Sequence, residues 1–414
     1  MPNPLVIGIT GPYGAGRSTA AQHFAELANC DVVKLSEFIR RELGEGERED
    51  VVRLQQKGDE IRSNRGDDAL AQDAVDCIVK SGQEIAIVDG IKHPDEASAL
   101  SEAFLFYLVA VEASVGVCRE RTLRSPAISG SVDRFDEISR RDRREVDQWG
   151  FAVSHGQQTD ACVDLADAII WNDKAVQDPQ PRQLEHQTGD REQLRNKVKG
   201  IWQKITESDK EKPSITEVRM CQAYTVAQRS TCPQRKVGAL ITNFFGSVVA
   251  EGYNEVPGKQ SSCIQMHGEC YRKVVRNQDL SDLAALFSCG KCGGKLGPDL
   301  VCLNGECGER YQRRLPPRKN LDYCRAVHAE ESAILQVSRF GGIGIENGTL
   351  YTTTYPCALC AKKVLQTGLS KVVFMRRYTM EDADDCLIGA ELVLEQFEGI
   401  TPRGFHRLFR NIED

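Results

Sequence analysis

The sequence predicts an α/β protein with two domains, and three observations support that prediction. Apolar, strand-like runs alternate with helical patterns in the first 173 residues, as in a parallel sheet with helices on both faces. A glycine-rich turn follows the first of these runs, and twelve of the sixteen cysteines lie between Cys221 and Cys386. The second half is therefore expected to be an α/β/α domain with a metal-binding, cysteine-rich insertion.

The first domain is expected over residues 1–175. The first strand, LVIGIT, leads into GPYGAGRST and then into the helical pattern AAQHFAELA. In this order of strand, loop and helix, backbone amides at the helix N-terminus are placed to hold phosphate groups. The strands are predicted at 5–10, 84–90, 105–111 and 166–172.

The loop at residues 11–18 has the spacing of a phosphate-binding loop, G-x-x-x-x-G-K-[ST], with Arg17 at the lysine position. Ser18 is suited to Mg²⁺, and Asp89, which ends an apolar strand, is the candidate second acidic residue. Because arginine is bulkier and forked, we expect a nucleoside triphosphate with Mg²⁺ to bind without efficient phosphoryl transfer. A loop that binds nothing is the alternative. The candidate nucleotide-binding residues are Gly11, Gly14, Gly16, Arg17, Ser18 and Thr19.

A polar stretch with two prolines comes next, and we assign residues 176–213 to a linker with a connecting amphipathic helix. The second domain is expected over residues 214–414, with an irregular insertion at about 256–324. Its helices are predicted at 216–229, 328–339 and 357–367, and its strands at 237–242, 246–254, 348–354, 371–375 and 390–395.

Composition indicates a globular protein of the cytoplasm. Apolar residues make up 41% and charged residues 27% of the chain, and the N-terminus has no signal-peptide pattern. No run approaches the ~18 apolar residues of a membrane span, so no membrane partner is expected. In a reducing compartment, sixteen cysteines favour metal ligands over disulfides. A net charge of −7 with 7% aromatic residues argues against a protein that acts on polynucleotides, which needs a basic groove with stacking aromatics.

The strongest chemical pattern joins two helix starts in the second domain. His328 and Glu330 open one apolar helical pattern, and Pro356-Cys357-Ala-Leu-Cys360 opens another. This combination is typical of zinc nucleobase deaminases. The two cysteines share one helix face at an N-terminus that favours thiolate, and with His328 they leave a fourth zinc position for water. Glu330 is the candidate catalytic acid and base; the alternative is that it serves only the helix dipole.

Four segments resemble the deoxycytidylate deaminases of the cytidine deaminase superfamily: RSTCPQRKVGALI, GYN, VHAEESAI and YPCALCAKKVLQTGLSKVVF. The likeness covers about residues 214–380 and implies hydrolytic deamination of free deoxycytidine nucleotides. It further implies that Asn254 of GYN contacts the sugar. The sequence departs from the family at Glu255, where a glycine usually follows, and in its longer insertion. The weaker candidates for substrate contacts are Arg229, Arg235 and Tyr378.

The insertion contains CGKC and CLNGEC, which resemble the two knuckles of a zinc ribbon. Four thiolates with short, glycine-containing spacers suit a closed tetrahedral zinc site. Unliganded buried cysteines are the alternative reading. The ribbon ligands are predicted to be Cys289, Cys292, Cys302 and Cys307.

A further zinc site is implied by resemblance to phage-type deoxycytidylate deaminases, some of which carry an additional structural zinc. Cys232 and Cys263 fall at corresponding offsets from the KVGA and GYN motifs. Cys324 and either His267 or Cys270 complete the candidate set. Simple packing of these side chains is the alternative.

The first domain resembles kinases that act on nucleotides and on dephospho-coenzyme A, with an arginine-rich lid at 118–124 and 140–145. Such a domain ahead of a deaminase resembles the bacterial anti-phage deoxycytidylate (dCTP or dCMP) deaminases. That resemblance implies an antiviral role, a homo-oligomer and, in some members, a small inhibitory RNA. We expect the first domain to bind a nucleotide and to gate the deaminase. A nucleotide kinase, or a nucleotide-sensing regulatory protein with a vestigial deaminase, is the alternative.

Overall fold

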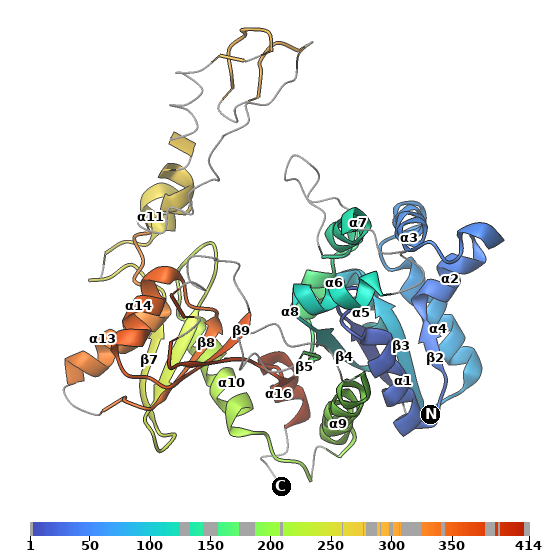
Figure 1. Ribbon diagram of the computed structural model, residues 1–414, viewed down its shortest axis with the longest axis horizontal. Helices are drawn as coiled ribbons and strands as arrows, with labels where there is room; N and C mark the ends of the chain where they lie inside the picture. Colours follow the sequence, from blue (N-terminus) through green and yellow to red (C-terminus); the bar gives the residue numbers. More distant parts are fainter. Residues whose placement is uncertain are drawn as a thin grey trace. The chain divides into compact units, whose positions relative to one another are not determined.

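The structure is a computed structural model of the 414-residue chain (Figure 1). Its described residues fall into two compact units, Met1–Cys221 with Gln396–Asp414, and Gln222–Glu395. The described residues are 3–124, 132–143, 156–173, 187–207, 210–258, 260–275, 277–278, 288–289, 291–297, 301–305, 307, 324–340, 344–376, 386–387 and 390–409.

The first unit is built on a six-stranded sheet in the order β11-β5-β4-β1-β3-β2, in which all pairs are parallel except β11 with β5. Four of these strands confirm the sequence prediction, whereas β2 and β11, of three and two residues, are too short for a periodic pattern to reveal. The strands are β1 Leu5–Thr10, β2 Val32–Lys34, β3 Ile85–Ile91, β4 Leu105–Glu112, β5 Ala168–Trp171 and β11 Gly399–Ile400.

Helices cover both faces of this sheet, as predicted (Figure 1). The described helices of the unit are α1 Arg17–Ala28, α2 Leu35–Arg41, α3 Val51–Arg65, α4 Ala69–Ser81, α5 Pro94–Ala103, α6 Val115–Leu123, α7 Val132–Arg143, α8 Thr159–Asp164, α9 Gln187–Thr206 and α16 Pro402–Leu408, with a 3-10 turn at Glu45–Glu47. The boundary between the units falls within α10, Ile215–Ala227.

Helix α9 belongs to the first unit, so the assignment of residues 176–213 to a linker with a connecting helix needs correction. Leu194, Val198 and Ile201 are buried in one core cluster with α1 and the sheet. Burial of such an apolar stripe stabilises the unit by about 1.5–3 kcal/mol per fully buried side chain. The polar stretch of the linker before α9 lies mostly outside the described residues.

The C-terminal segment also belongs to the first unit, which corrects the predicted boundary of 214–414 for the second domain. Strand β11 covers the edge of β5, where Gly399 pairs with Ile169 and Ile400 with Ala168. Arg407 of α16 donates to Asp167 Oδ1 at 2.7 Å and to the Phe106 carbonyl at 2.6 Å. An exposed edge strand is a liability that proteins cover, and here the covering strand comes from the far end of the chain.

The second unit is therefore inserted into the first, with one chain connection before it and one after it. Its five-stranded sheet has the order β10-β9-β8-β6-β7, in which β8 and β9 are parallel and β6 is antiparallel to both neighbours. The elements are β6 Gly238–Thr242, β7 Val248–Tyr253, α11 Cys263–His267, α13 Ala329–Phe340, β8 Thr349–Thr354, α14 Ala358–Gln366, β9 Lys371–Arg376 and β10 Val393–Gln396.

Candidate metal centre and active site

The predicted histidine and cysteines converge in the second unit. His328 directly precedes α13, and Cys357 is the N-cap of α14 with Cys360 in its first turn. His328 Nδ1 lies 3.3 Å from the sulfur of Cys357 and 3.4 Å from that of Cys360. Two helix N-termini therefore present one imidazole and two thiols to a common point.

These three side chains fit a zinc ion. Their donor atoms all lie within 4.8 Å of one another, and the sulfur–nitrogen distances match the roughly 3.5 Å expected for Zn–S of about 2.3 Å and Zn–N of about 2.0 Å at tetrahedral angles. Hydrogen bonds from Cys360 and His328 lower the pKa of the Cys357 thiol to about 4 despite its burial. The thiolate, which is the form that binds metal, is thus favoured at neutral pH.

Glu330 lies in the first turn of α13, two residues beyond His328, and is only 4% exposed. A helix dipole alone does not explain such burial, because a carboxylate that only serves a helix end remains in water. Burial raises the pKa of Glu330 to about 7. A carboxyl group with that pKa can both accept and return a proton at neutral pH, as a general acid–base requires.

Two backbone features hold α13 in place beside the sheet. A Cβ at Gly252, in the GYN motif, would lie 2.2 Å from the Ala329 carbonyl oxygen and 2.4 Å from the Ala333 amide. Glycine is therefore needed for β7 to approach the helix that carries Glu330. The backbone of Glu255 pairs with Val327, a contact that does not depend on the side chain at position 255.

Asn254 is buried beside this strand and holds the loop before β6. Its Oδ1 accepts from Val237 N at 2.8 Å, and its Nδ2 donates to the Arg235 carbonyl at 2.9 Å. An amide side chain has two donor hydrogens and two acceptor lone pairs. Within the described part of the chain, one donor and one acceptor of this side chain are left for a ligand. The residue thus both shapes the loop and retains hydrogen-bonding capacity.

The other predicted substrate contacts lie on the surface or outside the described residues. Arg229 is exposed and stacks over the Tyr253 ring at 5.3 Å. Arg235 is also exposed and uses its carbonyl for Asn254. Tyr378 falls outside the described residues.

The four ribbon cysteines also lie together. The sulfur of Cys289 is 3.8 Å from that of Cys307, and Cys292 is 3.4 Å from Cys302. All four sulfurs lie within 4.8 Å of one another. A Cβ on Gly294 would come within 3.3 Å of two of these sulfurs, so glycine leaves the room that a Cys₄ zinc site needs.

The further set is less closely gathered. Cys232, Cys263, Cys270 and Cys324 line one small cavity of about 20 Å³. Among the described residues, they do not form one of the groups whose donor atoms lie within 4.8 Å of one another. His267 instead packs against the Tyr271 ring at 4.8 Å, so Cys270 is the better fourth member.

In the first unit, the predicted phosphate loop connects β1 to α1 and contains Gly11, Gly14 and Gly16, with Arg17, Ser18 and Thr19 beginning the helix. Arg17 Nε donates to Asp89 Oδ1 and Ser18 Oγ donates to Asp89 Oδ2, each at 2.8 Å. Asp89 therefore lies beside the loop, although β3 continues to Ile91 and does not end at Asp89 as the sequence suggested.

Two residues near this loop were not predicted from the sequence. Lys92 follows β3, and its Nζ donates to the Gly11 carbonyl at 2.7 Å and contacts the Asp142 carboxylate. Asp142, from α7, accepts from Tyr13 N at 2.6 Å. The only feature of the sequence that could have identified Lys92 is its position three residues after Asp89. Asp142 lies in a run of basic residues, so no pattern distinguishes it.

Comparisons with known proteins agree with the geometry of the second unit. Residues 213–376 match the family model described as the cytidine and deoxycytidylate deaminase zinc-binding region. The matched segment contains the His328, Glu330, Cys357 and Cys360 cluster. This part of the chain is similar to deaminase zinc-binding regions. The chain is accordingly grouped with hydrolases that act on carbon–nitrogen bonds of cyclic amidines.

Two relatives are named deoxycytidylate deaminase. That of Saccharomyces cerevisiae is 29% identical over 219 residues, 51% of this chain and 56% of that protein. That of Schizosaccharomyces pombe is 24% identical over 391 residues, 93% of this chain and 94% of that protein. A solved shikimate kinase from Acinetobacter baumannii in complex with shikimate is 16% identical and covers 51% of this chain and 96% of its own, with a TM-score of 0.29. Among the described residues, no helix has the length and apolar character needed to cross a membrane.

Proposed function

We propose that this protein hydrolytically deaminates free deoxycytidine nucleotides, dCMP or dCTP, to the uracil nucleotide and ammonia. The observation that carries the proposal is the convergence of His328, Cys357 and Cys360 beside the buried Glu330. The names of the two yeast relatives support a deoxycytidylate substrate. A reducing compartment suits the free thiols, so we place the protein in the cytoplasm.

Three sets of residues have separate roles in the proposed reaction. His328, Cys357 and Cys360 would hold zinc, which when bound supplies a Lewis acid that activates water at neutral pH. Glu330 accepts a proton from that water and passes protons to ring N3 and to the leaving amino group. Asn254 has one donor and one acceptor left, with which it holds the sugar.

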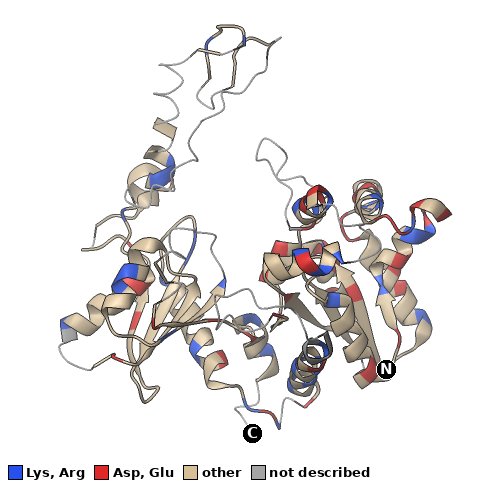
Figure 2. Ribbon diagram, in the orientation of Figure 1, with Lys and Arg blue, Asp and Glu red and all other residues tan. Residues whose placement is uncertain are grey.

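Mass spectrometry of products from three substrates tests this function. Purified protein is incubated separately with dCMP, dCTP and a cytosine-containing single strand. We expect conversion of one or both free nucleotides, and Glu330→Gln should slow it roughly 10²- to 10⁴-fold. Acidic and basic side chains are interspersed over the helices of both units (Figure 2), which fits a small substrate better than a polynucleotide. Conversion of the single strand alone would establish the alternative function of a polynucleotide deaminase.

We further propose that zinc has structural roles in this chain. The Cys289, Cys292, Cys302 and Cys307 cluster would form a closed site, because thiolates occupy all four tetrahedral positions. Cys232, Cys263 and Cys324, with Cys270, would form a further site in the cavity that they line. Zinc stoichiometry of metal-replete protein measures this directly: one zinc per chain would eliminate both structural sites.

The first unit is proposed to bind a nucleoside triphosphate with Mg²⁺ and to gate deamination without being an efficient kinase. The support is the glycine loop at the start of α1 and the two chain connections between the units. Ser18→Ala is the suitable test, since a Cβ at Gly16 would lie 2.3 Å from Asn172 Nδ2 and Gly16→Val would distort the loop. The deamination rate of Ser18→Ala should lose its dependence on added ATP and Mg²⁺. Robust γ-phosphate transfer to a deoxynucleotide would instead establish a kinase.

An antiviral role, assembly into a homo-oligomer and control by a small inhibitory RNA are proposals that rest on the resemblance to anti-phage deoxycytidylate deaminases. Depletion of a deoxynucleotide pool is a direct consequence of the proposed reaction. Cells that carry the wild-type chain or Glu330→Gln are compared for dCTP content and phage yield after infection. Equal yields in the two strains would remove the antiviral role while leaving the enzymatic reaction in place.

A further inference from the structure

The phosphate loop of the first unit lacks a free cation at its expected position. Arg17 stands where phosphate loops have lysine, and its Nε is bound to Asp89 at 2.8 Å while its Nη1 reaches the Gly11 carbonyl at 3.4 Å. The same carboxylate accepts from Ser18. The charge of Arg17 is therefore largely neutralised by an ion pair within the loop itself.

Lys92 occupies the place that Arg17 leaves vacant. Its side chain is 9% exposed, donates to the Gly11 carbonyl at 2.7 Å and contacts the carboxylate of Asp142, which is 2% exposed. A buried ammonium and a buried carboxylate each cost several kcal/mol to desolvate and must compensate one another. This pair thus lies against the loop rather than at the surface.

Asp142 takes two of the contacts that a bound phosphate would take. One carboxylate oxygen accepts from Tyr13 N, a backbone amide of the loop, at 2.6 Å. The other contacts Lys92 and accepts from Thr159 Oγ1 at 3.2 Å. An anion held jointly by a loop amide and a lysine ammonium matches the way in which phosphate loops hold phosphate oxygens.

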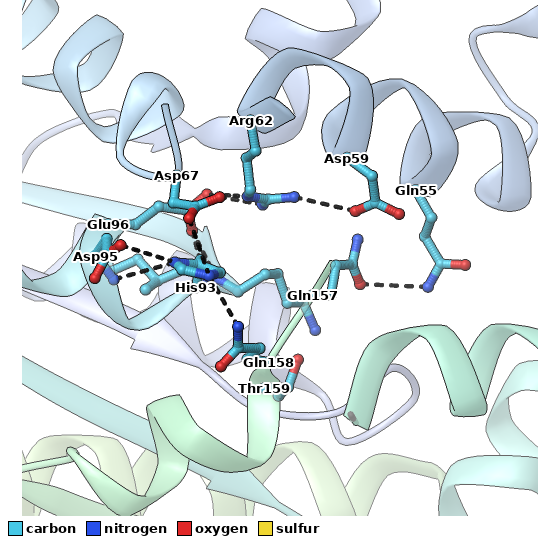
Figure 3. A network of polar contacts seen from close by, with 12 residues as sticks. Gln55, Asp59, Arg62, Asp67, His93, Asp95, Glu96, Gln157, Gln158 and Thr159 are labelled. Carbon is cyan, nitrogen blue, oxygen red and sulfur yellow. Dashed lines mark hydrogen bonds and ion pairs between the residues drawn. The ribbon is translucent and has the colours of Figure 1, made fainter. Parts of the chain in front are cut away.

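The backbone around Lys92 is fixed by a buried ion pair. Glu96 Oε2 accepts from Lys92 N at 2.8 Å and from His93 N at 3.1 Å. Its other oxygen accepts from Arg62 at 2.7 Å, and Figure 3 shows this arginine reaching across from α3 to Glu96. Lys92 is therefore placed by a rigid support, whereas Asp142 sits in the last turn of the separate helix α7.

A cavity of about 300 Å³ opens beside these residues. Its lining includes Arg17, Lys34, Arg40, Arg62 and Lys92 against three acidic residues, Glu49, Asp89 and Asp142. Cavities of roughly this size and larger hold small-molecule ligands. Arg17, Arg62 and Lys92 are paired with Asp89, Glu96 and Asp142, so an anionic ligand would bind here by taking the place of one of these carboxylates.

We propose that Lys92, in place of Arg17, is the phosphate-binding cation of the loop, and that Asp142 is an internal anion that the phosphate of a nucleoside triphosphate displaces. This inference rests on the proposed nucleotide binding by the first unit and is independent of deamination. Displacement of Asp142 frees α7 from the loop, so that occupancy of the site is converted into movement of that helix.

Calorimetric titration of the full chain with inorganic tripolyphosphate and with ATP tests whether phosphate binds Lys92 and displaces Asp142. Neither probe contains cytosine, and the variants of Lys92, Arg17 and Asp142 separate binding at the phosphate loop from phosphate contacts at the deaminase site. We expect Lys92→Met to weaken binding at least tenfold, Arg17→Ala to weaken it less than threefold, and Asp142→Asn to tighten it at least tenfold. Lys80→Met, which removes a charge from an exposed position of α4, is the matched control and should bind like wild type.

Unpairing a buried charge can unfold the unit, so melting temperatures accompany each titration. If Lys92→Met fails to fold, the double variant Lys92→Met/Asp142→Asn is used in its place, because it removes both charges of the pair. Its affinity is then compared with that of Asp142→Asn alone. Near-normal binding when Lys92 is removed, or loss of binding in Arg17→Ala, would overturn the role of Lys92. Unchanged or weaker binding in Asp142→Asn would overturn the role of Asp142. Absence of binding in both wild type and Asp142→Asn would remove nucleotide binding by this unit altogether, without affecting the proposed deamination.

Discussion

The candidate sites of the two units differ in whether their ligand-binding groups are already engaged with other side chains of the protein. In the second unit, His328, Cys357 and Cys360 already converge beside a buried glutamate. In the first unit, Arg17 is paired with Asp89 and Lys92 with Asp142. A metal centre can be preorganised because hydrogen bonds from Cys360 and His328 stabilise the Cys357 thiolate before metal binds. Cations that await a phosphate must instead be paired with other anions when buried. The difference is consistent with the proposed roles, a metal centre for deamination in the second unit and nucleotide binding in the first.

The largest effect should come from the metal ligands of the catalytic centre. Cys357→Ser should lose one zinc per chain and all measurable deamination, because an alcohol is a far poorer zinc ligand than a thiolate. Zinc content is measured by mass spectrometry of the metal and activity by ammonia release. Cys77→Ser, at an exposed position of the first unit, is the matched control. Retention of activity in Cys357→Ser would contradict the claim that Cys357 is a ligand of the catalytic zinc.

The ribbon is expected to affect folding rather than chemistry. Cys292→Ser should lower the zinc content by one and make the insertion sensitive to proteolysis, since metal binding is coupled to folding in small Cys₄ sites. The catalytic zinc should remain. An unchanged zinc content in Cys292→Ser would show that these four cysteines lie together without a metal.

The metal ligands of the second unit could be predicted from the sequence, whereas the buried charge pairs of the first unit could not. The deaminase ligands belong to short local patterns at helix starts, where spacing alone places His328, Cys357 and Cys360. The buried charges of the first unit come from distant segments: Lys92 and Asp142 are fifty residues apart. No local pattern reveals such a pair. The return of residues 399–408 to the first sheet was missed for the same reason, because the pairing of β11 with β5 crosses the whole second unit.

Because the C-terminal segment packs on the first sheet, we expect a mutation in α16 to have a moderate effect on stability. Arg407→Ala removes the cation paired with the buried Asp167 and should destabilise the first unit by about 2 kcal/mol. For a unit of this size we expect its melting temperature to fall by roughly 4–8 °C. Zinc content should not change. Arg403→Ala, at an exposed position of the same helix, is the control, and equal melting of the two variants would argue against a structural role for the C-terminal helix.

The smallest effect is the dependence of phosphate binding on pH. Burial and the nearby Arg17 lower the pKa of Lys92 to about 8, although Asp142 opposes the shift and the Cys162 thiol also lies near. An anion binds the charged ammonium, so affinity for tripolyphosphate should fall as pH rises through 8, by up to about tenfold per pH unit above the pKa. The titration of the ligand itself is subtracted by use of Lys92→Met. The same pH profile in both proteins would show that Lys92 does not face the phosphate.

The most direct test of the preorganised centre is to measure zinc content and dCMP and dCTP deamination in the same preparations of wild type and Glu330→Gln. Glutamine keeps the shape of the buried side chain but cannot shuttle protons. We predict that the variant retains the zinc content of wild type and deaminates the accepted nucleotide roughly 10²- to 10⁴-fold more slowly. Wild-type turnover by zinc-replete Glu330→Gln would contradict the account.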